Sequence, residues 1–99
     1  GYNGLSMYAS TKGAIEAFSK NTAREWGRIG IRSNCIVAGF METEMSGTLS
    51  DEQRDRIYKR TSLKKPTDTK SVANTIEFLL SDGSNSITGQ NINVDSGTI

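Results

Sequence analysis

The stretch SMYASTKGAIEAFSKNTAREWGRIGIRSNCIV, from Ser6 to Val37, carries a long helical pattern followed by a short strand pattern. Apolar or near-apolar side chains recur in its first part at steps of three and four residues, the period of an amphipathic helix. These positions are Met7, Ala14, Ile15, Phe18, Thr22 and Trp26. We predict a helix from Ser6, as its N-cap, to about Gly27, and a covered strand over Ile31 to Val37.

Three further elements follow toward the C-terminus. Ser50 to Arg60 begins with a capping residue and runs polar, which predicts a short surface helix. A second long helix is predicted to begin at Asp68 or Thr69 and to end before Asp82-Gly83, because apolar residues share one helical face. They are Val72, Ala73, Ile76, Leu79 and Leu80. Residues 90–95 alternate apolar and polar side chains, as a strand does.

The order of these elements decides the fold class. A strand, a helical crossover and a strand form a βαβ unit, whose strands are parallel and whose crossover is right-handed. We therefore predict an α/β fold with the order helix, strand, short helix, helix, strand. Two strands are too few to cover two long helices, so upstream sequence, further copies of the chain or both are needed.

Length and composition narrow the class of protein. The 99 residues allow one domain at most, and the chain starts at Gly1 without an initiator Met, which indicates a fragment, a processed chain or a cloning remnant. The formal net charge of +1 points to neither nucleic acid nor an anionic membrane, and the apolar runs fall short of the ~20 residues of a membrane helix. A lone Cys35 fits a reducing cytoplasm. The absence of His removes the Ser-His-Asp scheme and the usual zinc ligands.

Although the net charge is close to zero, one cluster of basic residues occurs in the sequence, at Lys59, Arg60, Lys64 and Lys65. Acidic residues lie close by in the sequence, at Asp51, Glu52 and Asp55. A mixed cluster of this kind is typical of a solvated helix face, which we favour over a phosphate site.

Tyr8 and Lys12 form a Tyr-x-x-x-Lys motif on the first predicted helix. This spacing places the phenol and the ammonium on one helical face, one turn apart. A free phenol titrates near about pH 10 and is a poor acid–base catalyst at neutral pH, but a nearby ammonium favours the phenolate. The motif alone is weak, since a surface Tyr beside a solvated Lys gives the same spacing.

Three separated motifs in order strengthen the chemical interpretation. They are YASTKGA with the later IRSNCI, then NCIVAGFMETEM from Asn34, and ITGQNINVDSG from Ile87. Together they resemble the short-chain dehydrogenase/reductase family over nearly the whole chain. The GFMETEM wording is most similar to 3-oxoacyl-[acyl-carrier-protein] reductases, and sugar and polyol dehydrogenases have similar stretches. The resemblance implies the C-terminal part of a Rossmann-like, doubly wound parallel sheet, with residues 1–99 an incomplete single domain.

The resemblance also implies roles for individual residues. Tyr8 is then the catalytic acid/base, and Lys12 tunes it and binds the nicotinamide ribose. Gly39 lets the backbone approach the nicotinamide, while Met41 and Thr43 bind its carboxamide; a turn glycine, a packing Met and a capping Thr remain the alternatives. Residues 45–62 would form the substrate lid.

Departures from the family pattern limit what the chain is expected to do alone. Ala38 stands where the family usually has Pro, and Ser96 replaces the first Gly of a terminal Gly-Gly. The glycine-rich phosphate turn, the Asn-Asn-Ala-Gly strand end and the catalytic Ser all precede the family's Tyr, and none can be placed in residues 1–7. The choice between NAD and NADP is made in that same missing region.

Two functions of different classes remain. In the first, the chain belongs to an NAD(P)-dependent oxidoreductase that acts on a small carbonyl or alcohol substrate, acyl-ACP included; alone it binds no cofactor and is inactive. In the second, the chain is a truncated remnant that serves as an oligomerisation module, because the family's interface helices are retained. A homo-oligomer is expected in both cases, since the apolar stripes need cover. A third explanation is that these residues are the ordered or proteolysed part of a full-length enzyme.

Overall fold

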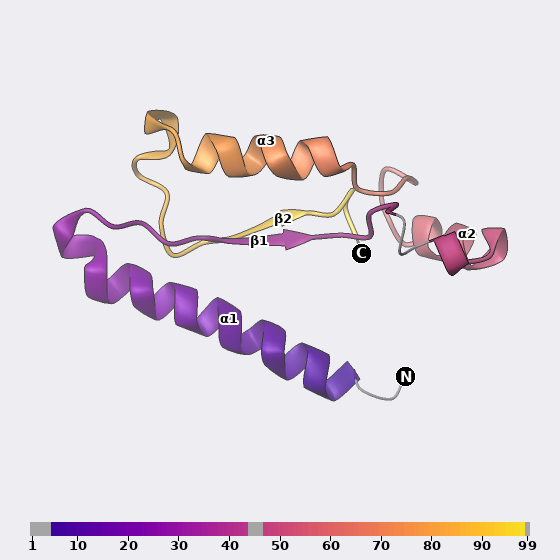
Figure 1. Cartoon of the computed structure of the whole chain (residues 1–99), viewed down its shortest axis with the longest axis horizontal. Helices are drawn as coiled ribbons and strands as arrows, with labels where there is room; N and C mark the ends of the chain where they lie inside the picture. The colour runs from indigo at the N-terminus through magenta and orange to yellow at the C-terminus, as the bar shows by residue number, and fades with distance from the viewer. Residues whose placement is uncertain (1–4, 44–46, 99) are drawn as a thin grey trace.

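A computed structural model describes residues 5–43 and 47–98, which form a two-stranded parallel sheet between two long helices (Figure 1). Helix α1 and helix α3 lie on opposite sides of the strands, and α2 lies beyond the carboxyl ends of the strands. The element bounds are α1 Leu5–Trp26, η1 Gly27–Ile29, β1 Cys35–Ala38, α2 Asp51–Lys59, α3 Thr69–Leu79, η3 Asp82–Ser84 and β2 Asn91–Val94. The predicted α/β class and the element order are confirmed.

The helix ends follow local side-chain chemistry. Ser50 accepts a hydrogen bond from the Gln53 amide, and the Gln53 side chain accepts one from the Ser50 amide, which completes a capping box at the start of α2. Asp68 caps α3 in the predicted place, and the Ser71 hydroxyl and amide that donate to its carboxylate lower its pKa. The predicted N-cap at Ser6 is wrong, because α1 already includes Leu5 and Ser6 lies within the helix.

The strand predicted over 31–37 begins later, at Cys35. It pairs with β2 in parallel register from Cys35↔Asn91 to Ala38↔Val94. Before Cys35 the chain contacts the segment before β2 through Asn34, which donates to the Ile87 carbonyl and accepts from the Gln90 amide, and through one backbone bond from the Gly89 amide to the Ser33 carbonyl. These contacts replace a regular ladder there, which explains the shorter strand.

The carboxyl ends of the strands are closely packed. A Cβ on Gly39 would lie 2.7 Å from both the Asp95 Cα and the Thr67 Oγ1, so no larger residue fits beside β2. The Thr67 amide donates to the Phe40 carbonyl at 2.8 Å, which holds the segment before α3 against the same loop. A bridge between Thr61 and Thr98 closes this edge.

The outward helix faces are uncovered. Among the described residues, Ala23 and Leu79 are the buried apolar side chains. Phe18 on α1 is 74% exposed and Leu80 at the end of α3 is 80% exposed. The expectation that two strands cannot cover both helices is confirmed.

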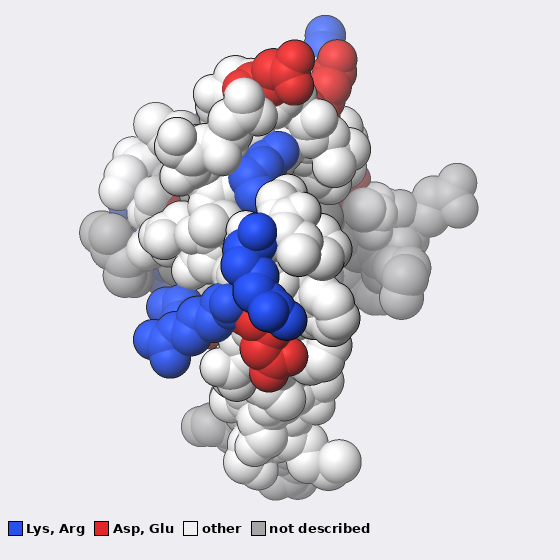
Figure 2. Space-filling view, turned by 90° about the vertical axis from the view of Figure 1, so that its left-hand side faces the viewer, with Lys and Arg blue, Asp and Glu red and all other residues white. Residues whose placement is uncertain are grey.

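The charge distribution is mixed where it can be seen. Figure 2 shows the end of the molecule where α1 and α3 finish, with Lys and Arg side chains gathered beside Asp and Glu side chains. On this face the basic group is bounded by acidic side chains, so the face does not carry a single sign of charge. No helix within residues 5–43 and 47–98 combines the length and apolar character needed to cross a membrane.

Candidate active site

Tyr8 and Lys12 come together at the mouth of the sheet, as their spacing predicts. Both line a cavity of about 440 Å³ whose wall continues through Val37, Ala38 and Gly39. They also line a second cavity, of about 240 Å³, between α1 and β1. The phenol and the ammonium therefore face the carboxyl end of β1, which is where open α/β sheets bind their ligands.

The accessibility of the two groups suits proton exchange with a ligand. The Tyr8 side chain is exposed and Lys12 is half-buried. Thr11, between them on α1, donates its hydroxyl to the Met7 carbonyl within the helix. A ligand seated in the larger cavity would thus meet an available hydroxyl and an available ammonium on one side.

The opposite wall of the larger cavity comes from α2 and the segments that follow it. Ile57 of α2 and Arg60, directly after the helix, line it, together with Lys65 and Asp95. Arg60 and Lys65 belong to the basic cluster noted in the sequence, and Lys12 adds a third cation to the same cavity. The charged side chains of the cavity are therefore three cations and one carboxylate, set among apolar residues such as Val37, Phe40 and Ile57.

The loop after β1 holds the remaining residues singled out from the sequence. Gly39 lines the cavity, and its close packing against Asp95 gives it a structural reason in addition to the expected one. Met41 is half-buried and Thr43 is exposed; neither is among the residues that line this cavity. Residues 45 and 46 of the expected lid, 45–62, lie outside the described residues.

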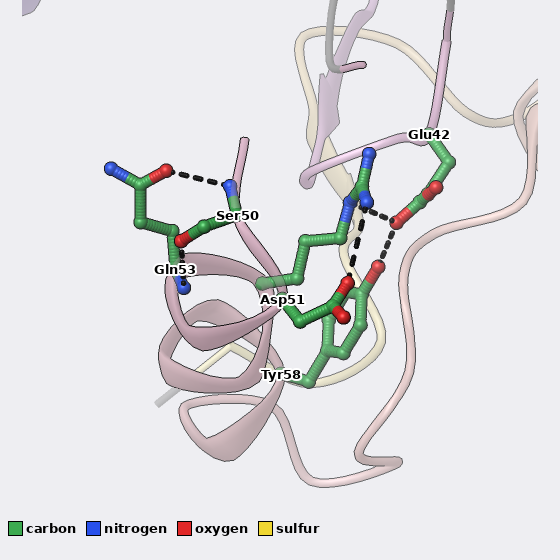
Figure 3. A network of polar contacts seen from close by, with 6 residues as sticks. Glu42, Ser50, Asp51, Gln53 and Tyr58 are labelled. Atoms are coloured by element: carbon green, nitrogen blue, oxygen red, sulfur yellow. Dashed lines mark hydrogen bonds and ion pairs between the residues drawn. The ribbon is translucent and has the colours of Figure 1, made fainter. Parts of the chain in front are cut away.

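Glu42 is a residue that the sequence reasoning missed. Its carboxylate accepts a hydrogen bond from the Tyr58 hydroxyl and lies 3.1 Å from the Arg54 Nε, so it connects the loop after β1 to α2 (Figure 3). The hydrogen bond to Glu42 is the main cause that raises the pKa of Tyr58. No short spacing in the sequence signals this contact, because its partners lie 12 and 16 residues downstream.

Comparisons with known proteins agree with this arrangement. The family profile described as "Enoyl-(Acyl carrier protein) reductase" matches residues 1–98. The 3-oxoacyl-[acyl-carrier-protein] reductase FabG of Escherichia coli is 37% identical over 97 residues, which are 98% of this chain and 40% of that protein. The corresponding FabG of Chlamydia trachomatis is 39% identical over 97 residues, 98% of this chain and 39% of that protein. The chain belongs to the short-chain dehydrogenase/reductase family.

Solved structures of this family share the fold. A 3-oxoacyl-[acyl-carrier protein] reductase from Brucella melitensis aligns with a TM-score of 0.88 at 33% identity, over 92% of this chain and 34% of that one. A 4-hydroxyisoleucine dehydrogenase complexed with NADH aligns with a TM-score of 0.86 at 30% identity, over 91% of this chain and 38% of that one. The short-chain dehydrogenase/reductase chain described here thus spans about 40% of the length of the relatives that it matches.

The residues present fit one part of the NAD(P) cofactor that this family uses. Lys12 and Tyr8 offer an ammonium and a hydroxyl beside the carboxyl end of β1, which suits the nicotinamide and its ribose. The 99 residues contain no Gly-x-Gly-x-x-Gly turn for the pyrophosphate. Within residues 5–43 and 47–98, no group of His, Cys, Asp and Glu is arranged to hold a metal ion.

Proposed function

We propose that these residues form the proton-transfer part of an NAD(P)-dependent oxidoreductase that interconverts a carbonyl and a secondary alcohol. The observation that carries the proposal is the shared cavity of Tyr8 and Lys12 at the carboxyl end of β1. Ligands of doubly wound sheets bind at this end, so the phenol lies in the region where a reacting carbonyl would bind.

The chain's own residues manage the proton. Tyr8 and Lys12 would hold the nicotinamide ribose of NAD(P), which would supply the hydride for the carbonyl carbon. The Tyr8 hydroxyl gives its proton to the carbonyl oxygen, which becomes the alcohol, and Tyr8 regains a proton from solvent through its exposed side. Lys12 stabilises the phenolate between these events and binds the ribose, while Met41 and Thr43 bind the carboxamide. In the oxidative direction Tyr8 takes the alcohol proton.

We further propose a 3-oxoacyl thioester as the substrate class and the cytoplasm as the place of action. Support for the substrate comes from the names of the relatives, which are 3-oxoacyl-[acyl-carrier-protein] reductases. Support for the compartment comes from the single cysteine, which offers no internal disulfide.

We expect the 99-residue chain by itself to catalyse no reduction. The uncovered face of α1 and the absence of a phosphate turn leave most of the dinucleotide without a binding surface. Fluorescence titration of the isolated chain with NADPH, and with NADH, should therefore show no saturable binding. Reductase turnover by the isolated chain would contradict this part of the proposal.

A chimera tests the catalytic part. The amino-terminal part of Escherichia coli FabG, joined to this chain where the alignment begins, should reduce a 3-oxoacyl thioester with NADPH. Tyr8→Phe should lower kcat by about 10²- to 10⁴-fold, because the general acid is lost. Lys12→Met should also lower activity, because the phenolate loses its neighbouring cation. Lys20→Met, two turns further along α1 and outside the cavity, is its control and should retain activity. A folded chimera in which Tyr8→Phe retains full activity would refute the assignment.

A second candidate function is an assembly module without catalysis. It is favoured by one observation, the exposed apolar side chains of α1 and α3, among them Phe18 and Leu80. Such faces become buried when copies of the chain associate. Light scattering should then give a discrete homo-oligomer of the isolated chain, whereas a stable, folded monomer would argue against this function.

A further inference from the structure

The loop after β1 and helix α2 meet at a polar junction centred on Glu42 (Figure 3). The Tyr58 hydroxyl donates to Glu42 Oε1, and the Arg54 Nε lies 3.1 Å from the same oxygen. Arg54 also reaches Asp51 at 3.9 Å within α2. The Arg54 Nε atom is buried, while 24% of the Arg54 side chain and 43% of the Glu42 side chain stay accessible, so the ion pair is partly solvated.

An aromatic contact joins the same two segments. The rings of Phe40 and Tyr58 are tilted by 52° with centroids 6.2 Å apart, a separation typical of favourable aromatic pairs. Tyr58 is thus held at its ring by Phe40 and at its hydroxyl by Glu42. Two independent contacts therefore fix the same face of α2 on the loop.

Within the described residues, hydrophobic burial contributes little to holding helix α2 in place. It contains no buried residue, and its sequence DEQRDRIYK offers only Ile57 and Tyr58 as apolar side chains. The capping box at Ser50 and Gln53 stabilises the helix itself, but it does not determine where the helix lies. Polar contacts such as those of Glu42 must therefore fix the position of α2, because hydrophobic burial does not.

The position of α2 matters for the proposed active site, because Ile57 and Arg60 line the cavity that Tyr8 and Lys12 line from the other side. Ile57 is adjacent in sequence to Tyr58, and Arg60 follows the helix directly. A shift of α2 away from Glu42 would therefore move both wall residues.

We propose that Glu42 is a positioning residue for substrate: by binding Arg54 and Tyr58 it fixes α2 on the loop after β1 and so sets the wall opposite Tyr8 and Lys12. The catalytic meaning of this junction rests on the function proposed above. Its structural content, a loop-to-helix tie made by one carboxylate, does not.

Hydrogen exchange tests the structural content without any activity. In the 99-residue chain, Glu42→Ala should speed exchange of the α2 amides by about tenfold, and Glu42→Gln by about threefold, because Gln still accepts from Tyr58 but no longer pairs with Arg54. Glu52→Gln is the matched control, because it also removes one carboxylate charge. Glu52 lies on α2, 3.9 Å from Arg56, and both of these side chains are solvent-exposed. It should leave the exchange rates of residues 54–59 unchanged. Wild-type rates in Glu42→Ala, or equal acceleration in Glu52→Gln, would overturn the proposal.

Kinetics of the chimera test the positioning role. Glu42→Ala should raise KM for the 3-oxoacyl thioester by about tenfold with kcat changed by less than about twofold, because Tyr8 and Lys12 are untouched. The milder variant Glu42→Gln, which still accepts from Tyr58, should raise KM by only about threefold. A fall in kcat at constant KM, or an equal rise of KM in both variants, would overturn the positioning role. If the unaltered chimera is inactive, the proposed function fails, while the exchange experiment still decides whether Glu42 holds α2.

Discussion

The carboxyl edge of the sheet and the outward faces of α1 and α3 are built in opposite ways. At the edge, Gly39 packs directly on Asp95, and the segments 61–63 and 96–98 are joined by backbone hydrogen bonds. On the helix faces, large apolar side chains such as Phe18 and Leu80 stand in solvent. The edge is complete within the described residues, whereas the helix faces lack a neighbour.

This difference separates what the chain specifies by itself from what it needs others to supply. The groups proposed for proton transfer lie at the complete edge, so their geometry depends on contacts internal to the chain. Cofactor binding and assembly depend on the uncovered faces. Substitutions at the edge should therefore change stability strongly, and substitutions on the faces should change association instead.

Gly39→Ala should have the largest effect on stability. The new Cβ would lie 2.7 Å from the backbone Cα of Asp95, which cannot move aside without opening the sheet. We expect a loss of about 3 kcal/mol in the free energy of unfolding, measured by urea denaturation.

Gly13→Ala is the matched control for this glycine. A Cβ there meets nothing within 4 Å in the middle of α1, and Ala favours the helix. The same substitution should then stabilise the protein by about 1 kcal/mol. Equal effects of the two variants would break the contrast between the edge and the helix.

Arg32→Met should come next. The Arg32 guanidinium donates to the Leu79 carbonyl at 2.9 Å and to the Ile87 carbonyl at 3.2 Å, so it holds the end of α3 to the segment before β1. Losing these charge-assisted bonds should cost about 2 kcal/mol in urea denaturation. Arg56→Met, which breaks only an exposed pair with Glu52, should change stability by less than about 0.5 kcal/mol. Similar losses in both variants would show that the partly buried hydrogen bonds of Arg32 add nothing to stability.

The sequence predicted the parts of this molecule that periodicity and capping control. The helices α1 and α3, the Ser50 and Asp68 caps and the parallel strands were confirmed, whereas the cap at Ser6 was wrong and Leu80 lies after α3, exposed. The start of β1 was wrong by four residues, because Asn34 and its neighbours bind the segment before β2 through side chains. The periodicity of apolar residues describes one element at a time, so it does not predict contacts between two segments.

The candidate site divides along the same line. The Tyr8 and Lys12 placement follows from one helical turn, and the sequence predicted it. The Glu42 junction and the close approach of Gly39 to Asp95 join segments far apart in the chain, so no local sequence pattern predicts them. The chemistry assigned to Met41 and Thr43 stays a prediction.

Ser96→Gly should give a smaller, favourable change. Ser96 has φ 58°, a left-handed conformation in which its Cβ crowds the backbone, and the family resemblance places Gly there. Relief of this strain should stabilise the protein by about 1 kcal/mol. The loss of the weak 3.3 Å hydrogen bond that Ser96 donates to the Pro66 carbonyl should offset part of this gain. Urea denaturation of the two proteins measures the difference. A destabilised Ser96→Gly would mean that this hydrogen bond outweighs the strain.

Phe18→Gln should have the smallest effect on stability and tests the other half of the contrast. Since Phe18 is 74% exposed, its removal should change the free energy of unfolding by less than about 0.5 kcal/mol. Ala23→Gln, on the same helix but buried, should destabilise the chain by about 2 kcal/mol because the longer side chain does not fit. Light scattering should show weaker self-association in Phe18→Gln if α1 is an assembly surface. A large loss of stability in Phe18→Gln would mean instead that this face is already covered within the chain, and the distinction between the edge and the helix faces would fall.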